Sequence, residues 1–361
     1  MRVVLISHDD RFGLAVAQGI LDTQARLVAL LKKKRKVKGL LGLGYSLGHG
    51  IMCSWLGAVI KLTPNQLFPF CRRNKIKYLR VPRVNDPQFG KILSELRPDI
   101  IVVSRFSEIL PSEVISIPWL GILNIHCSLL PQLRGPEPIA AAIIGGFSES
   151  GVTIHYMDRG IDTGDIILQK RIPLEAAETN QTFHEKAALV MQPMIAEVMK
   201  MLLAGNVTRT KQDHSKASYF SIKKIFGSDD VYVDWSQPSR IIEAFVRAGI
   251  TCLVSCKGAH FRVRKARIVP FWTSSKVQPG KIIVKTKTGL VVGTSDTPLE
   301  IAVSLVLRQR WWSRTNFRGS AEGSVIEVQR LFNRYPLSTL KEGDQLESGS
   351  WPNLNDVLTI P

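Results

Sequence analysis

Apolar and polar positions in the first 200 residues follow the pattern of alternating strands and helices. Four apolar runs have the length of buried strands: 1–7, 27–31, 77–81 and 99–104. Stretches with helical spacing lie among them: 12–23, 64–75 and 86–96. Because strand–helix–strand units form parallel sheets, this order predicts a mainly parallel sheet covered by helices. A helical stretch at 181–204 closes this part, so we expect an α/β, Rossmann-like domain over residues 1–205.

The rest of the chain has shorter apolar runs and begins after a polar linker at 206–216. A helical stretch at 237–247 is followed by runs that look like barrel strands: 258–268, 280–286, 289–294 and 299–303. Short strands separated by turn residues are typical of small barrels. We therefore expect a smaller OB-like β-barrel domain over 217–349 and a loose tail over 350–361.

Composition supports two domains and indicates an anionic partner. The 361 residues are 45% hydrophobic, which is enough for two cores. A net charge of +18 favours binding to nucleic acid, to a phosphorylated substrate or to a membrane surface. The five cysteines are odd in number and mostly far apart, which is typical of a reduced, cytoplasmic protein. Neither they nor the scattered histidines have the spacing of metal ligands, so we expect no metal.

A basic run followed by an apolar stretch interrupts the first domain at about 32–62. The basic run, which we predict to bind a polyanion, is Lys32, Lys33, Lys34, Arg35 and Lys36. Residues 39–60 carry no charge, and a basic cluster beside such a segment favours anionic lipid. Two interpretations stay open for 39–60: a pair of core-packed helices, or peripheral contact with the inner membrane surface. A true span is disfavoured because it would cut the sheet between strands.

The richest candidate site lies in residues 121–135. An apolar run there reads as a buried strand, and Asn124 and His126 share one of its faces because they are two residues apart. Burying such polar side chains without partners would cost a few kcal/mol each, so they require partners. Pro131 ends the strand in a loop, at the edge where α/β sheets keep their sites. Cys127 points away from that face, by the same alternation.

A second candidate segment follows at 151–165. It alternates like a strand up to Asp158 and then enters a loop rich in glycine and carboxylate, which contains Asp162. Taken alone, Asn124, His126 and Asp162 are each more often structural, as a satisfied amide, a core histidine and a turn residue. His155 reads as a structural or rim residue.

Taken together, the motifs in these two segments resemble those of a known protein family. Asn-x-His-x-Ser-Leu-Leu-Pro at 124–131, followed by Asp-x-Gly-x-Asp-Thr-Gly-Asp at 158–165, resembles the 10-formyltetrahydrofolate-dependent formyltransferases. Residues 100–111 also look like the strand and loop that face folate in that family. The resemblance implies transfer of a formyl group from 10-formyltetrahydrofolate to a primary amine. It implies that Asn124 and a protonated or proton-sharing His126 donate to the oxyanion, while Asp162 orients His126 and raises its pKa.

The resemblance also implies binding residues. Those carried over for folate are Phe106, Glu108, Ile109, Leu110, Pro111, Gly160 and Thr163. Those of the loop on the acceptor side are Ser128, Leu129, Leu130, Pro131 and Arg134.

Three hypotheses about the function remain open, and two of them differ in the amine that accepts the formyl group. Asp234-Trp235 and the helical stretch ending at Arg247 resemble the C-terminal domain of methionyl-tRNA formyltransferases, which predicts tRNA as the partner. Arg134-Gly-Pro-Glu-Pro138 stands where tRNA enzymes have Gly-Ala-Ala-Pro, which favours a nucleotide-linked amino sugar or another small amine instead. The third hypothesis is a catalytically inactive member that binds RNA or a membrane.

Overall fold

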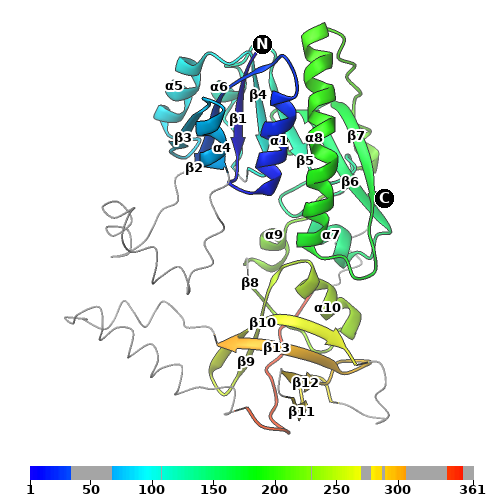
Figure 1. Ribbon diagram of the computed structural model, residues 1–361. Helices are drawn as coiled ribbons and strands as arrows, with labels where there is room; N and C mark the ends of the chain where they lie inside the picture. The colour runs from blue at the N-terminus through cyan, green and yellow to red at the C-terminus, as the bar shows by residue number, and fades with distance from the viewer. Residues whose placement is uncertain are drawn as a thin grey trace, which may run out of the picture.

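A seven-stranded sheet organises the first part of the molecule. The computed structural model describes residues 1–33, 67–106, 108–228, 230–269, 278–286, 289–305 and 340–352 (Figure 1). The sheet order is β3-β2-β1-β4-β5-β6-β7. The strands are β1 (Arg2–Ser7), β2 (Arg26–Lys33), β3 (Lys77–Val81), β4 (Ile100–Ser104), β5 (Ile122–His126), β6 (Glu149–Tyr156) and β7 (Ile166–Pro173). Pairing is parallel from β3 to β5 and antiparallel from β5 to β7, which confirms the mainly parallel α/β sheet.

Helices cover both faces of this sheet. They are α1 (Arg11–Leu21), α4 (Leu67–Arg73), α5 (Pro87–Leu96), α6 (Ser112–Ile115), α7 (Pro138–Ile144) and α8 (Asn180–Ala204). Helices α1, α4, α7 and α8 belong to one hydrophobic core, and α5 and α6 belong to the other. Among the described helices α8 alone is long and apolar enough to cross a membrane, but it packs along α1 and the sheet as a core helix.

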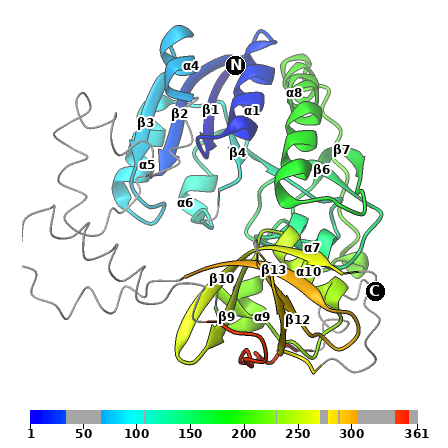
Figure 2. The ribbon, with the colours of Figure 1, turned by 60° about the horizontal axis from the view of Figure 1, so that its bottom comes forward.

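A second β-sheet domain follows. Its order is β11-β12-β13-β10-β9-β8, with only the β8–β9 pair parallel. The elements are η1 (His214–Lys216), α9 (Ile222–Phe226), β8 (Asp230–Tyr232), α10 (Ser239–Arg247), β9 (Thr251–Cys256), β10 (Ala259–Ile268), β11 (Ile282–Lys285), β12 (Leu290–Val292) and β13 (Leu299–Leu305). Figures 1 and 2 show it beneath the first sheet, with α7 and α10 at the junction.

The C-terminal segment is more firmly packed than the sequence predicts. Gln345 bridges to Lys281 and Glu347 to Ser255, so this segment joins the β11 and β9 sides of the second sheet. We expected a loose tail from residue 350, but Trp351 is buried and its ring lies 4.3 Å from that of Phe245. That expectation is wrong for Trp351, because its indole fills the core beneath α10.

The structure describes only the beginning of the basic and apolar insertion, Lys32 and Lys33 at the end of β2. Lys34, Arg35, Lys36 and residues 39–60 lie outside the described residues, so polyanion binding and membrane contact there remain predictions.

Candidate active site

Strand β5 presents Asn124 and His126 on the face predicted by alternation. Ile122, two residues before Asn124 on the same face of β5, packs into the core that contains α5 and α6. Cys127 is on the other face and packs into the opposite core. Cys127 is buried, and burial raises the pKa of its thiol to about 12. A thiol held neutral in this way is a poor nucleophile, which agrees with its orientation away from the site.

The loop after β6 brings Asp162 to these two residues. Oδ1 of Asp162 accepts a hydrogen bond from Nδ2 of Asn124 at 3.1 Å. Oδ2 accepts from the main-chain N–H of Gly135 at 2.9 Å and lies 3.6 Å from Nδ1 of His126. The three side chains that the family motif singled out therefore form one cluster.

His155 is a buried fourth member of this cluster, so of the two alternatives that the sequence left open, a structural or a rim residue, the structure excludes the rim. It lies opposite Asn124 in the β5–β6 pair, and its Nε2 is 3.1 Å from Nδ2 of Asn124 and 3.7 Å from Oδ1 of Asp162. Its Nδ1 lies 2.8 Å from the carbonyl oxygen of Tyr156 and must donate to it, because a carbonyl can only accept. Because the amide nitrogen of Asn124 can only donate, Nε2 of His155 is its acceptor.

His126 lies between two acceptors in a buried position. Its Nε2 donates to the carbonyl oxygen of Leu133 at 2.9 Å, and Asp162 faces its Nδ1. Burial lowers the pKa of His126, and the opposing effects of Asp162 and the Leu133 carbonyl do not restore it. We expected Asp162 to raise this pKa. The carboxylate does act in that direction, but the cost of burying a charged imidazole outweighs it.

Asp162 is the charged member of the cluster. Burial alone would raise the pKa of its carboxyl, but the two histidines and the Gly135 amide lower it to about 2. At neutral pH the site therefore holds a carboxylate beside a mainly neutral imidazole.

The loop after β5 is held by hydrogen bonds within itself and to strand β6. Oγ of Ser128 donates to the carbonyl oxygen of Gln132 at 2.7 Å, and Leu130 N–H donates to Oγ1 of Thr153 at 3.2 Å. Ser128 and Leu130 are buried, and the Leu130–Pro131 peptide is cis. The structure thus gives Ser128 and Leu130 a role in shaping the loop.

Arg134 points into the protein, toward a residue that the sequence did not single out. Its guanidinium donates to Oε1 of Gln212 at 2.6 Å and lies 3.2 Å from Nδ1 of His214. Nε2 of Gln212 donates to the main-chain oxygens of Asp162 at 2.8 Å and Gly164 at 2.7 Å. Residues 206–216 were predicted to be a linker, and nothing local in the sequence marks Gln212 as part of a site.

The loop after β4, which the family resemblance predicts to face folate, has main-chain groups without partners among the described residues. The N–H and C=O groups of residues 108–110 form no hydrogen bond with other described residues. Ile109 is exposed and Leu110 buried, while the carboxylate of Glu108 accepts from Val84 N–H at 3.0 Å and pairs with Lys33. Only the main chain of Glu108 is therefore open to a ligand.

Two further sets of predicted residues have internal partners. Asp158 accepts from Gly160 N–H at 2.9 Å and from Oγ1 of Thr163 at 2.5 Å, so Gly160 and Thr163 stabilise the turn before Asp162. Nζ of Lys32 lies 2.8 Å from Asp9, so Lys32, like Lys33, is already paired with a carboxylate.

Comparisons with known proteins match both halves of the chain. The family model described as formyl transferase matches residues 55–199, and the model described as formyl transferase, C-terminal domain, matches residues 227–308. A methionyl-tRNA formyltransferase of Caldanaerobacter subterraneus subsp. tengcongensis is 34% identical over 60% of this chain and 69% of its own. One from Pseudomonas fluorescens is 33% identical over 66% of this chain and 74% of its own.

Solved structures share the fold at low identity. The sugar 3N-formyltransferase WlaRD, crystallised with dTDP and 5-N-formyl-THF, has a TM-score of 0.59 at 18% identity over 85% of this chain and 99% of its own. An N-formyltransferase from Helicobacter canadensis, in complex with folinic acid and dTDP-3-aminofucose, has a TM-score of 0.58 at 18% identity, over 84% of this chain and 99% of its own.

Proposed function

Because the chain belongs to the formyl transferase family, we propose that it transfers a formyl group from 10-formyltetrahydrofolate to the amino group of methionyl-tRNA. The observation that carries this proposal is the cluster of Asn124, His126 and Asp162, three polar side chains brought together from one strand and one loop. Their chemistry is that of acyl transfer to an amine, which needs donors for an oxyanion and a group that accepts a proton.

In this proposal Asn124 acts on the formyl oxygen, and His126 acts on the proton of the amine. As the amine nitrogen attacks the formyl carbon, the C=O electron pair moves to oxygen, and the Asn124 amide donates to that oxygen. One such donor is worth about 3–4 kcal/mol of transition-state stabilisation. His126, mainly neutral beforehand, takes up the proton that the amine releases, and the Asp162 carboxylate stabilises the imidazolium that forms. That proton then returns to the leaving nitrogen as the C–N bond to the donor breaks.

The same face of the sheet fits a folate donor. The main-chain groups of residues 108–110, which bond to no other described residue, would suit the donor and acceptor edge of a pteridine. The exposed side chains of Ile109 and Ile161 offer apolar contact on the two loops beside β5. When bound, 10-formyltetrahydrofolate supplies the formyl carbon, and the chain supplies orientation, donors and the proton acceptor.

Two observations favour tRNA over an amino sugar. The net charge of +18 suits a large polyanion, and relatives named methionyl-tRNA formyltransferase match 60% or more of this chain. The sequence at 134–138 differs from that of tRNA enzymes, which favoured a sugar as acceptor. Part of this difference is structural, because Oε2 of Glu137 accepts a hydrogen bond from Ile222 N–H at 3.2 Å. Amino-sugar formylation remains the second candidate, since the neighbours WlaRD and the Helicobacter canadensis enzyme are titled with sugar nucleotides.

The test is formyl transfer from 10-formyltetrahydrofolate to charged initiator Met-tRNA, run beside a panel of dTDP-linked amino sugars. We expect formyl-Met-tRNA as the product. If product forms only from an amino sugar, the acceptor is that sugar and not tRNA. If no product forms from either, the proposed function is contradicted.

The salt dependence of tRNA binding tests the basic run separately. Since Lys32 and Lys33 are paired with Asp9 and Glu108, phosphate contact would fall on Lys34, Arg35 and Lys36. Replacing these three by Ala should make the slope of log K against log salt shallower by about 2–3, because each phosphate contact contributes about 0.9. An unchanged slope would remove this run from the RNA surface.

A further inference from the structure

The segment that joins the two sheets, residues 207–220, also joins the two loops of the candidate active site. We call this segment the strap. At one end Thr210 pairs with Ile166, just after the Asp162 loop, through two main-chain hydrogen bonds of 2.8 Å. At the other end Arg134 N–H donates to Ser218 O at 2.8 Å, and Phe220 N–H donates to Arg134 O at 3.0 Å. The strap therefore crosses from the loop after β6 to the loop after β5.

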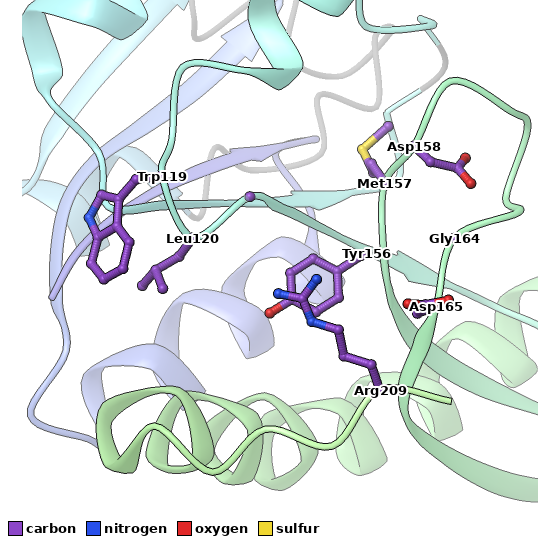
Figure 3. Close-up of a pocket in the computed structure, with 9 residues that line it drawn as sticks. Trp119, Leu120, Tyr156, Met157, Asp158, Gly164, Asp165 and Arg209 are labelled. Carbon is purple, nitrogen blue, oxygen red and sulfur yellow. The ribbon is translucent and has the colours of Figure 1, made fainter. Parts of the chain in front are cut away.

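The start of the strap is fixed by an aromatic contact. The guanidinium of Arg209 lies 3.8 Å from the centre of the Tyr156 ring, an attractive arrangement of a cation over an aromatic face (Figure 3). Both side chains line a cavity of about 350 Å³ together with Gly164 and Asp165, at the base of the Asp162 loop. This contact leaves the following residues of the strap little freedom to move away from that loop.

Gln212 is the residue of the strap whose side chain reaches into both loops. It is buried, and both polar ends of its amide are used. The amide nitrogen donates to the main-chain oxygens of Asp162 and Gly164, while the amide oxygen accepts from Arg134. Asp162 has φ +54°, in the left-handed region that is unfavourable for a residue other than glycine. Such a conformation persists only where neighbours hold it, and Gln212 holds the carbonyl of that same residue.

We propose that Gln212 is a positioning residue for formyl transfer, which fixes the backbone of Asp162 so that its carboxylate stays against Asn124 and His126. This inference rests on the proposed role of Asp162 in the reaction. Gln212 acts through Asp162 and Arg134 and touches none of the reacting atoms. Through Gln212 the strap therefore helps to hold the catalytic side chains in place.

Two substitutions separate the functions of the Gln212 amide. Gln212→Ala removes all of its bonds, whereas Gln212→Glu keeps an acceptor for Arg134 and loses both donors to the Asp162 loop. Gln345→Ala is the matched control, since Nε2 of Gln345 also donates to two main-chain oxygens, of Pro279 at 2.8 Å and Leu346 at 3.3 Å. Gln345 lies in the C-terminal segment of the second domain, away from the site.

The experiment measures kcat and KM for formyl transfer to Met-tRNA, and the titration of the Asp162 carboxyl by NMR, on the full-length chain. For both Gln212 variants we expect kcat to fall about 10- to 100-fold, the range for a small misplacement of a catalytic group, with KM for 10-formyltetrahydrofolate within about twofold. The pKa of Asp162 should rise from about 2, because its carboxylate loses alignment with its partners. Gln345→Ala should change none of these quantities.

The outcomes distinguish this inference from the proposed function. Wild-type kcat and an unmoved Asp162 titration in Gln212→Ala would overturn the inference, as would an equal loss in Gln345→Ala. Asp162→Asn is measured in parallel: if it stays active, the proposed site itself is wrong. If the wild type forms no product with Met-tRNA, the same variants are assayed with the dTDP-linked amino sugars, and the NMR titration decides for Gln212 without any acceptor.

Discussion

Asn124 and His155 face each other across β5 and β6, with Nδ2 of Asn124 3.1 Å from Nε2 of His155. The other hydrogen of the Asn124 amide goes to Asp162. Two acceptors from different elements therefore fix which way the amide points, and its nitrogen is turned toward the cluster. Because both amide hydrogens are engaged, the Asn124 amide exchanges one of these two bonds for a bond to the oxyanion during the reaction.

The first prediction concerns Asn124. Asn124→Ala should lower kcat for formyl transfer about 10²- to 10³-fold, because it removes one donor to the oxyanion. Asn74→Ala is the control, since Nδ2 of Asn74 donates only to the Phe70 carbonyl at the exposed end of α4. A wild-type rate in Asn124→Ala would exclude this side chain from the chemistry.

The second prediction concerns His155, which acts on the formyl group only through Asn124. His155→Ala should lower kcat about 10-fold, less than Asn124→Ala, since Asp162 still holds one hydrogen of the amide. The double variant tests this order: adding His155→Ala to Asn124→Ala should cause little further loss, because residues that act as one unit are not additive. Fully multiplicative losses would indicate that His155 has a separate role.

The third prediction is the pH dependence of catalysis. His126 must be neutral to take up the amine proton, and burial lowers its pKa below the usual value of about 6.5. The His126-dependent limb of kcat/KM should therefore fall as pH drops through a value below 6.5, and it should be flat above 7. If this limb instead fell as pH rose through that value, His126 would be needed in its protonated form.

Local pattern accounts for most of the fold and for half of the site. A period of two placed Asn124 and His126 on one face, because alternation along a strand does not depend on what the strand pairs with. The edge strand β7 was not predicted, because its central residues Lys170 and Arg171 are exposed and it lacks a long apolar run. The loop of Asp162 was a candidate from its glycine and carboxylate content, but only the family motif gave Asp162 itself a catalytic role.

Residues whose roles depend on distant partners could not be found in this way. His155 joins the site because of its register with Asn124, and no feature of 151–158 encodes that register. Gln212 reaches Asp162 across 50 residues, and Trp351 reaches Asp234 across 117. These contacts depend on how distant elements pack together. The spacing of residues within one element carries no information about that packing.

The fourth prediction concerns Trp351 and the C-terminal segment. Its indole N–H donates to Tyr232 O at 2.7 Å, its main-chain N–H donates to Asp234, and its ring packs on Phe245. Ending the chain after residue 349, or changing Trp351→Ala, should destabilise the second domain by about 3–5 kcal/mol. Urea unfolding measures this difference, and Trp351→Phe should retain more stability than Trp351→Ala because it keeps ring packing. Wild-type stability after truncation would show that this segment is indeed loose.

The fifth prediction tests the contact between the site loop and the strap at Gly135. Gly135 has φ +105°, its N–H donates to Asp162, and a Cβ there would lie 2.5 Å from Phe220 O. Gly146 also has positive φ, +66°, but a Cβ there would meet no atom within 4 Å.

The two glycine substitutions therefore differ in steric contact and in how readily an alanine can adopt the backbone angle. Gly146→Ala should cost only the conformational penalty of about 1–2 kcal/mol, whereas Gly135→Ala should cost about 1–3 kcal/mol more, because the loop and strap must separate. Gly135→Ala should also lower kcat, since moving the Gly135 amide removes a hydrogen bond from Oδ2 of Asp162, while Gly146→Ala should leave kcat unchanged. Urea unfolding and steady-state kinetics on the same preparations measure both effects. Equal losses of stability in the two variants, with kcat unaffected in both, would mean that the strap yields freely and does not hold the site.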